Sequence, residues 1–352
     1  MDFLLCSECF QDQGLKLDSE QIGIETETAC PNCGSKAGRK LSTQDIGALA
    51  HRFFVWGSLI RFDYGAAPQI QFNKYQSTSI DVLPWLEADV RLIEKALGVG
   101  FFHYGPRLWM LGEVEPLKGL QQKEDRASII ERIVSDYPAL CIGPDQVFYR
   151  VRVSPEVPGN FSEYDSPPIA LGGVGRLDST NFPVMYGSQD LEVCIHECRI
   201  TADDTVYVAT LAPTRELKLL DLTELVFEEH ISEFESLDMA VHMLFLAGEH
   251  SYDIARQIAL AAREAGYDGL VYPSYFSLLR TGAMPFETVY GISHRRIQRL
   301  ADREKSKIIP NLALFGHPIE RNDVEVRCIN KLILNRVEYD FHFGPVVIGA
   351  EL

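Results

Sequence analysis

The feature that most constrains this chain is a pair of cysteine doublets near its start. CSEC at residues 6–9 and CPNC at residues 30–33 give the spacing C-x2-C-x20-C-x2-C, and Gly34 follows at once. This spacing predicts two knuckles that close on one tetrahedral zinc ion, and a glycine permits the tight turn of a knuckle. Because cysteines would fill every position, the zinc would be structural and not catalytic. The predicted ligands are Cys6, Cys9, Cys30 and Cys33.

The other cysteines and the composition predict an ordinary intracellular protein. The chain has 352 residues and eight cysteines. Neither doublet lies between a predicted strand and a predicted helix, which disfavours a redox role, and the other cysteines form no secreted disulfide framework. No apolar run approaches the roughly 18 residues that a membrane span needs. The start, MDFLLCSECF, lacks the basic region and cleavage site of a signal peptide, so we expect a cytoplasmic protein with no membrane partner.

The strong negative charge limits the classes of ligand that the chain can bind. The net charge is −17, from 33 Lys and Arg against 50 Asp and Glu. A nucleic-acid-binding protein needs a basic stripe to neutralise phosphates. The small cluster of Lys36, Arg39 and Lys40 is better explained as the solvated edge of the ribbon. We therefore expect no nucleic-acid partner, and an anionic small ligand would need a local group of arginines.

The pattern of apolar residues divides the chain into three parts. Residues 1–41 hold the predicted zinc ribbon. Residues 42–143 contain the segments STQDIGALAHRFFVWGSLI, WLEADVRLIEKALG and DRASIIERIVSDY, whose helical spacing predicts a small all-α domain. Residues 144–352 begin with the alternating segment VFYRVRV and then mix strands with helices. This last part is predicted to be one α+β domain.

The segment CIHEC at residues 194–198 contains four residues of the types that bind metals: two cysteines, a histidine and a glutamate. The preceding VMYGS predicts a strand, and Ser188 can cap a helix that follows it. At about 100° per residue, His196 lies roughly 150° from the apolar face of this helix, so both cysteines and His196 cannot surround one ion. The predicted apolar face consists of Leu191, Cys194, Ile195 and Cys198.

Within this segment, Glu197 is the residue placed to reach a cleft. Cys194 and Cys198 are predicted to point into the core, where a reactive thiolate is disfavoured, so a Cys–His protease is rejected. Glu197 lies at the border of the apolar face, about 110° from its centre. The alternative for Glu197 is a solvated carboxylate on the flank of the helix.

Other polar residues accompany Glu197 in an informative order. Arg150 lies on the strand FYRVRV, and Arg176 and Tyr186 lie between that strand and Glu197. Ser274 follows the predicted strand GLVYP. The segments FYRV, GGVGRLDSTNFPVMYGSQDLEVCIHE and YDGLVYPS together resemble the RES-domain family over most of the α+β domain. The N-terminal region is similar to the cysteine-containing, helical extension that precedes this domain in some members.

The resemblance implies a fold, a substrate and roles for these residues. RES domains are similar to ADP-ribosyltransferases in fold and act on NAD, and many are toxins of toxin–antitoxin pairs. The chain would thus be an NAD glycohydrolase or ADP-ribosyltransferase-like enzyme that cleaves the nicotinamide–ribose bond, with water, phosphate or a protein as acceptor. Matched by position, Arg150, Glu197 and Ser274 are the family's Arg, Glu and Ser. Tyr186 matches the aromatic residue that precedes the Glu.

These residue types suit the implied chemistry. Arg150 offers a planar fork of donors to the pyrophosphate of NAD, and Arg176, after the glycines of GGVG, is a second candidate. Nicotinamide leaves as a neutral molecule, so one carboxylate, Glu197, is enough to stabilise an oxocarbenium-like transition state. Tyr186 could stack on nicotinamide or bond its ribose. Ser274 could hydrogen-bond the ribose or the amide.

A departure from the family pattern and a competing interpretation accompany this resemblance. Leu177 and Asp178 stand where many relatives carry an aromatic and a polar residue, which affects the pocket wall and not Glu197. The competing interpretation is a binding protein whose RES-like domain has lost turnover, although the presence of Arg150, Glu197 and Ser274 favours activity. The implied partners are NAD and a restraining antitoxin, and a homo-oligomer stays open.

Overall fold

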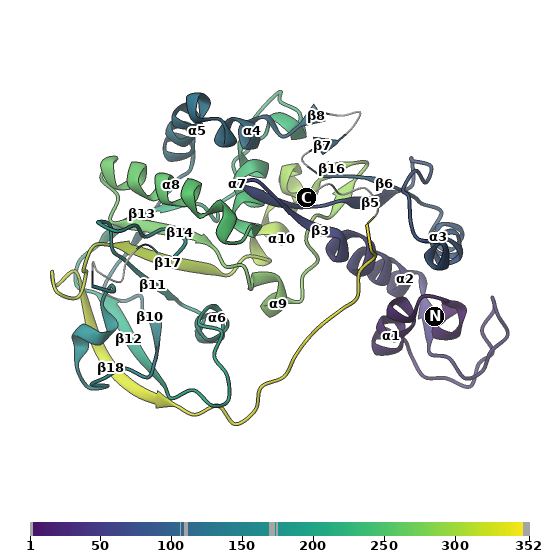
Figure 1. The fold of residues 1–352 in the computed structure, drawn as a ribbon, viewed down its shortest axis with the longest axis horizontal. Helices are drawn as coiled ribbons and strands as arrows, with labels where there is room; N and C mark the ends of the chain where they lie inside the picture. The colour runs from purple at the N-terminus through teal and green to yellow at the C-terminus, as the bar shows by residue number, and fades with distance from the viewer. Residues whose placement is uncertain (1–2, 106, 109–111, 169–172, 174, 348–352) are drawn as a thin grey trace.

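An eight-stranded mixed β-sheet lies on one side of the protein, on the left in Figure 1, and confirms the predicted α+β class. The computed structural model describes residues 3–105, 107–108, 112–168, 173 and 175–347. Strands β13 and β14 pair in parallel, and the other neighbours pair antiparallel. In spatial order the strands are β18 (Val324–Leu332), β12 (Val206–Pro213), β10 (Phe148–Val153), β11 (Val184–Ser188), β17 (Pro310–Phe315), β14 (Gly269–Pro273), β13 (Leu217–Asp221) and β9 (Ala139–Ile142).

The two faces of the sheet bury different side chains of the same strands. On β14, Leu270 and Tyr272 belong to the cluster formed with helices α7 and α8, whereas Val271 belongs to a second cluster on the opposite face. This alternation is the period of two that a strand imposes. The helices are α1 (Gln13–Ile22), α2 (Thr43–Ala50), α3 (Pro84–Leu97), α4 (Glu115–Gln121), α5 (Lys123–Asp136), α6 (Leu191–Glu197), α7 (Leu237–Leu246), α8 (Tyr252–Glu264), α9 (Ser277–Thr281) and α10 (Ala301–Ser306).

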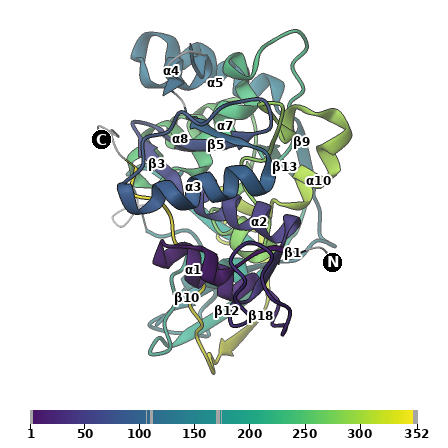
Figure 2. The ribbon, with the colours of Figure 1, turned by 90° about the vertical axis from the view of Figure 1, so that its right-hand side faces the viewer.

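The N-terminal part packs its helices around a separate apolar cluster. Strand β1 (Phe3–Cys6) pairs with β2 (Lys40–Ser42), and α2 contacts both α1 and α3 (Figure 2). A capping box between Ser42 and Asp45 starts α2. Helix α3 ends at Gly98, whose φ of 63° is the left-handed conformation that glycine adopts without strain.

Hairpins lie between the expected helices of residues 42–143. The helical run that begins at Thr43 ends at Ser58, because Ser58 Oγ accepts the backbone N–H groups of Gln69 and Ile70 and turns the chain into a hairpin. The hairpin strands are β3 (Leu59–Phe62) with β4 (Gly65–Pro68), β5 (Ile70–Asn73) with β6 (Gly100–His103), and β7 (Arg107–Leu108) with β8 (Gly112–Glu113). The pair β15 (Thr288–Val289) and β16 (Ile292–Ser293) forms a further short hairpin.

One hydrophobic cluster joins this N-terminal part to the eight-stranded sheet. Ala67 of β4, Leu117 of α4 and Ile133 of α5 are buried in the same cluster as Leu244 of α7 and Ile258 of α8. The segment before the large sheet therefore shares a core with it. No helix in the described ranges is both long and apolar enough to span a bilayer.

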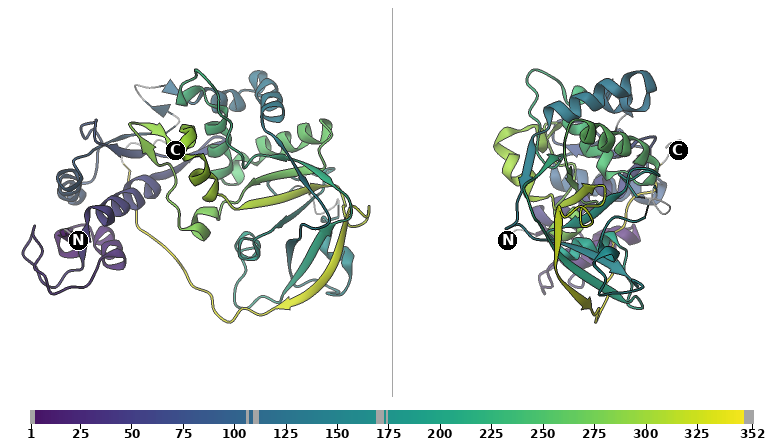
Figure 3. Two further views of the ribbon diagram at one scale, coloured as in Figure 1. Left: turned by 180° about the vertical axis from the view of Figure 1, so that it is seen from behind. Right: turned by 90° about the vertical axis from the view of Figure 1, so that its left-hand side faces the viewer.

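The C-terminal segment ties the two ends of the molecule together. After β18 it runs beneath the molecule, without regular structure, to the N-terminal helices (Figure 3). Phe343 packs against the N-terminal cluster, and its backbone N–H donates to Asp18 Oδ2 (3.1 Å). Arg52 forms an ion pair with Asp340 (3.3 Å). The first and last parts of the chain are thereby held together.

Candidate active site

Glu197 ends helix α6, where residues from two strands hold its carboxylate. Its Oε1 accepts hydrogen bonds from Ser274 Oγ (2.7 Å) and from Asn311 Nδ2 (2.6 Å). The side chain is exposed to a large cavity, and no hydrogen bond within the described ranges uses Oε2. One oxygen of Glu197 is therefore fixed in place, and the other is available to a ligand.

The helix that carries Glu197 begins at a different cap from the one predicted. Asp190, and not Ser188, is the N-cap, because Asp190 Oδ1 accepts from the backbone N–H of Val193 (2.9 Å). A carboxylate at this position both satisfies an open N–H group and complements the helix dipole. Ser188 Oγ instead donates to the carbonyl of Pro310 (2.8 Å). Ser188 thus anchors the start of the helix to β17.

Ser274 supports Glu197 from behind the cavity. It directly follows β14, is 4% exposed, and accepts a hydrogen bond from the backbone N–H of Phe276 (3.1 Å) while it donates to Glu197. It does not belong to the part of the described chain that lines the cavity. This geometry favours a role in orienting Glu197, whereas the sequence led us to expect contact with the ribose or the amide.

Asn311 is a site residue that the family motifs do not contain. It lies on β17, opposite Ser188 of β11 and Tyr272 of β14, and is 4% exposed. Its place beside Glu197 depends on the sheet order β11–β17–β14, which the sequence does not reveal. A local signal exists all the same, because an asparagine within the apolar strand PNLALF is unusual for a buried strand position.

The cavity beside Glu197 is large enough for a cofactor-sized ligand. Its volume is about 840 Å³, in the range of roughly 300–1,000 Å³ typical of small-molecule sites. Glu197 and Glu249 are its acidic lining residues within the described chain. The arginines that line it are Arg61, Arg150, Arg152, Arg176 and Arg199.

Arg150 is a buried cation without a carboxylate partner in the described chain. Its guanidinium donates to the carbonyl oxygens of Tyr186 (2.7 Å) and Asp165 (2.9 Å), and its Nε has no partner there. Burial, and then the nearby Arg152, lower the pKa of Arg150 to about 9, so it stays charged at pH 7. Arg152 lies two residues along the same strand and therefore on the same face. The alternation in FYRVRV could have indicated this second arginine.

Arg176 and Tyr186 organise the loop that forms another wall. Arg176 donates to the carbonyl of Ala247 (2.8 Å), and its guanidinium lies over the ring of Tyr252 (4.8 Å). The hydroxyl of Tyr186 donates to Asp178 (2.9 Å), and burial raises the pKa of Tyr186 well above its usual value. Only the ring of Tyr186 is thus left for a ligand.

A glycine makes the packing of this loop feasible. A Cβ at Gly175 would lie 2.1 Å from Asp178 Oδ1 and 2.8 Å from the Tyr186 hydroxyl. The sequence predicted that these glycines let the backbone approach a ligand. At Gly175, the close approach is to Asp178 and Tyr186, which hold the loop under Arg176.

The charge around the cavity contrasts with that of the whole chain. The net charge is −17, yet none of the five lining arginines forms an ion pair within the described ranges. Guanidinium groups without carboxylate partners in a partly enclosed site attract anions and bind phosphate through paired hydrogen bonds. The cavity is therefore suited to an anionic ligand, because it supplies the local group of arginines that such a ligand needs in this acidic chain.

The middle of the chain matches a known family. Residues 147–282 match the family model described as the RES domain. We name residues 147–282 the RES domain after this match. A chain in the crystal structure of the M. tuberculosis MbcT–MbcA toxin–antitoxin complex is similar at a TM-score of 0.31 and 14% identity, over 58% of this chain and 91% of that chain. No curated protein matches the chain.

The structure brings the predicted residues of the RES domain around one cavity. Arg150, Arg176, Tyr186 and Glu197 line it, and Ser274 contacts Glu197 directly. Their individual roles in binding or catalysis remain predictions. Asn311, which also contacts Glu197, lies beyond the residues that match the family.

The other members of the segment CIHEC have separate places in the RES domain. Cys194 is buried and donates to the carbonyl of Tyr149 (3.4 Å), as a core thiol should. Cys198 does not point into the core as predicted, because the helix ends at Glu197 and Cys198 then faces the cavity. The ring of His196 stacks on Phe276 at 5.4 Å. Cys194, His196 and Cys198 form no metal cluster in the described chain.

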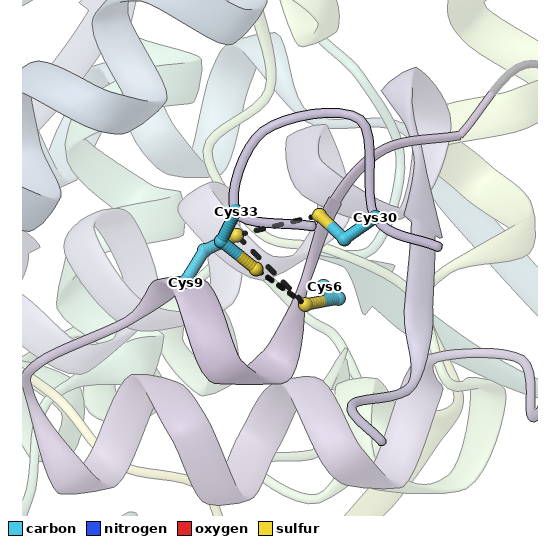
Figure 4. Close-up of side chains that lie close together, drawn as sticks. All are labelled: Cys6, Cys9, Cys30 and Cys33. Atoms are coloured by element: carbon cyan, nitrogen blue, oxygen red, sulfur yellow. Dashed lines mark hydrogen bonds between the residues drawn. The ribbon is translucent and has the colours of Figure 1, made fainter. Parts of the chain in front are cut away.

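The N-terminal cysteines converge at a distance from this cavity. Their sulfur atoms point toward one another (Figure 4) and all lie within 4.8 Å of one another. The separation is 3.8 Å from Cys6 to Cys9, 3.5 Å from Cys6 to Cys33, and 3.6 Å from Cys9 to Cys30. With Zn–S bonds of about 2.3 Å, a tetrahedral site places its sulfurs about 3.8 Å apart. The donors therefore fit one zinc ion.

A second group of potential metal ligands already contains a cation. Glu287, His294 and Glu304 lie close together. The ammonium of Lys307 is 2.5 Å from Glu287 and 2.6 Å from Glu304. Since the lysine occupies the position that a metal would take, this group is explained as an internal ion network.

Proposed function

We propose that the protein consumes NAD by cleaving the bond between nicotinamide and ribose, and that it acts in the cytoplasm as the toxin of a toxin–antitoxin or defence system. The observation that carries the proposal is a fixed carboxylate, Glu197, on a cavity lined by arginines without carboxylate partners in the described chain. The match of residues 147–282 to the RES domain supports the choice of NAD and of a toxin.

In this proposal the arginines bind the pyrophosphate of NAD. The Nε of Arg150 is buried without a partner in the described chain, and leaving such a donor unpaired costs about 1–3 kcal/mol. A phosphate oxygen would satisfy it. Arg152 lies on the same strand face, and Arg176 adds a third guanidinium from the loop wall. The ring of Tyr186 then offers an apolar surface to nicotinamide or its ribose.

Glu197 acts on the ribose end of the substrate. Ser274 and Asn311 hold Oε1, so Oε2 can accept a hydrogen bond from a ribose hydroxyl. As the bond between C1′ of the ribose and the nicotinamide nitrogen breaks, its electron pair stays with the nitrogen and positive charge develops on the ribose. A preorganised carboxylate stabilises that charge. No general acid is needed, because nicotinamide leaves as a neutral molecule.

The acceptor then bonds to the ribose carbon that nicotinamide leaves and completes the reaction. With water the products are ADP-ribose, nicotinamide and one proton. With phosphate they are ADP-ribose 1″-phosphate and nicotinamide, and with a protein nucleophile the ADP-ribose is attached to that side chain. The cavity has room for an acceptor beside Glu197, since its volume is about 840 Å³.

The proposed function is tested by incubating the purified full-length chain with NAD and identifying the products by mass. We expect loss of NAD with release of one nicotinamide per NAD consumed, and the mass of the second product identifies the acceptor. The assay is run with and without inorganic phosphate. If neither NAD loss nor nicotinamide is detected in either buffer, the alternative of a catalytically silent binding domain is favoured.

Replacing Arg150 by lysine should weaken substrate binding more than it slows the chemical step. Lysine keeps the charge but lacks the Nε donor that the proposal gives to a phosphate oxygen, so we expect KM for NAD to rise about tenfold or more, as loss of a charged hydrogen bond predicts. Steady-state kinetics measures KM and kcat. Arg327→Lys, on the exposed face of β18 in the same sheet, is the matched control and should leave both constants unchanged. An unaltered KM in Arg150→Lys would assign Arg150 to packing alone.

The remaining parts of the chain receive roles in this proposal. We propose that residues 1–41 form a zinc ribbon held by Cys6, Cys9, Cys30 and Cys33, and that residues 144–352 form the catalytic unit. A restraining antitoxin is the expected protein partner. Such a partner would have to deny NAD access to the cavity beside Glu197.

A further inference from the structure

One wall of the cavity comes from outside the RES domain. Leu59, Ile60 and Arg61 of β3, with Ala66 of β4, line the same cavity as Glu197. The residues that match the family begin only at 147. The hairpin β3–β4 of the N-terminal extension therefore reaches the site that the RES domain forms.

The hairpin is packed firmly against the domain. Ala67 is fully buried in the cluster that contains helix α7, and β4 and α7 are in contact. A ring nitrogen of His250 is 3.0 Å from the carbonyl oxygen of Gly65, at the tip of the hairpin. Arg126 of α5 lies over the ring of Tyr64 (5.1 Å). These contacts, with α7, His250 and α5, fix the position of the hairpin at the cavity.

Arg61 meets the loop that also holds Arg176. A Cβ built on Gly248 would lie 3.2 Å from the guanidinium carbon of Arg61, so this guanidinium rests directly on the Gly248 backbone. Arg176 donates to the carbonyl of the preceding residue, Ala247. Two arginines, one from the extension and one from the RES domain, thus contact successive residues of one loop on the cavity wall.

The side chain of Arg61 retains its donors for a ligand. Within the described ranges it forms no hydrogen bond or ion pair, although it is exposed at the cavity. Some exposed arginines away from the cavity are paired: Arg91 pairs with Glu87, and Arg303 pairs with Glu287. An arginine that lies on a cavity wall without a carboxylate partner is suited to an anion in that cavity.

We propose that Arg61 binds the pyrophosphate of the nucleotide together with Arg176, so that the extension supplies a binding residue to the active site. The identity of the ligand rests on the proposed function. The extension is then a part of the enzyme and not only a restraint on it. Two guanidiniums from different elements bring more donors and more positive charge to the pyrophosphate than Arg176 alone does.

The test compares Arg61→Ala and Arg61→Lys with the wild-type full-length chain. Steady-state kinetics with NAD gives KM and kcat, and titration calorimetry with ADP-ribose gives a Kd that does not depend on turnover. We expect Arg61→Ala to raise both KM and the Kd for ADP-ribose about tenfold or more, with a smaller change in kcat, and Arg61→Lys to restore part of the affinity. Arg91→Ala, an exposed arginine of α3 far from the cavity lining, is the control and should change neither constant.

A second variant, measured together with thermal unfolding, distinguishes a specific loss of affinity from misfolding. Gly248 has φ −87°, which alanine adopts readily, but the added methyl would press on the Arg61 guanidinium. Gly248→Ala should therefore also raise KM and the Kd for ADP-ribose, while thermal unfolding of each variant stays close to that of the wild type.

The outcomes separate this inference from the proposed function. If the wild type consumes NAD and Arg61→Ala has the same KM and Kd, the proposed function stands and the role of Arg61 is overturned. If the wild type leaves NAD intact but binds ADP-ribose more tightly than Arg61→Ala does, the proposed function fails and the role of Arg61 stands. If the wild type binds neither nucleotide, both are overturned.

Discussion

Replacing Glu197 by glutamine is expected to lower kcat for NAD cleavage by about 10² or more, with little change in KM. The amide oxygen of glutamine can still accept hydrogen bonds from Ser274 and Asn311, so the side chain should keep its place. What the variant lacks is the negative charge that stabilises the oxocarbenium-like transition state. Loss of one preorganised electrostatic contact typically costs a factor of about 10²–10³ in kcat. NAD loss measured with nicotinamide release gives both constants.

The matched control for this prediction lies on the same helix. Glu192 is an exposed carboxylate of α6 that pairs with Arg280 (3.0 Å) and does not line the cavity. Glu192→Gln makes the same chemical change one and a half turns away and should leave kcat nearly unaltered. Equal kcat in wild type and Glu197→Gln would remove Glu197 from the mechanism. An equal loss in both variants would indicate damage to α6 instead.

Local sequence patterns could predict the residues of the site that lie on regular elements of the RES domain. Arg150 could be placed because FYRVRV alternates as a strand does, and Glu197 because it borders the apolar face of a helix. Both line the cavity. Ser274 could be placed after a strand, but its contact with Glu197 could not, since that contact joins residues far apart in the sequence.

The parts that the sequence did not reveal depend on contacts between distant elements. Asn311 reaches Glu197 only because β17 lies between β11 and β14. Arg61 reaches the cavity only because the hairpin β3–β4 packs on α7. Cys198 was assigned to the core because the helical period was continued past Glu197, where the helix ends. Periodicity describes one element and cannot state which elements meet or where an element stops.

In the N-terminal part, the sequence predicted the cysteine cluster better than the secondary structure. The spacing of the cysteines alone indicated one cluster of four sulfurs, and the structure brings them together. The helical spacing of residues 42–143 indicated helices, but the hairpins between them were not expected. The turn into β3–β4 depends on Ser58, whose hydroxyl accepts two backbone N–H groups from beyond the hairpin. A serine at the end of an apolar run gives no such signal by itself.

Replacing Cys33 by serine is expected to abolish zinc binding and to unfold the N-terminal ribbon. The binding free energy of structural zinc is about 10–16 kcal/mol in zinc-finger peptides, as large as the total stability of a typical domain. Cys33 is exposed, so the substitution removes a ligand without removing a buried side chain from the core. Cys141→Ser alters another exposed thiol outside the cluster and is the matched control. Metal content by mass spectrometry and thermal unfolding are the two measurements.

Cys33→Ser should destabilise the N-terminal part more than the loss of one exposed thiol would. Strand β1 pairs with β2, and β2 leads into α2, whose residues Ile46 and Leu49 lie in the same apolar cluster as Leu5 and Leu41. Without zinc, few contacts would hold the knuckle of Cys30 and Cys33, because most side chains of residues 25–37 are exposed, so the two knuckles would separate. We expect one zinc per chain in the wild type and in Cys141→Ser, none in Cys33→Ser, and a separate early unfolding transition in that variant alone. Zinc-free wild-type protein with an unchanged unfolding curve would show that the ribbon folds without metal.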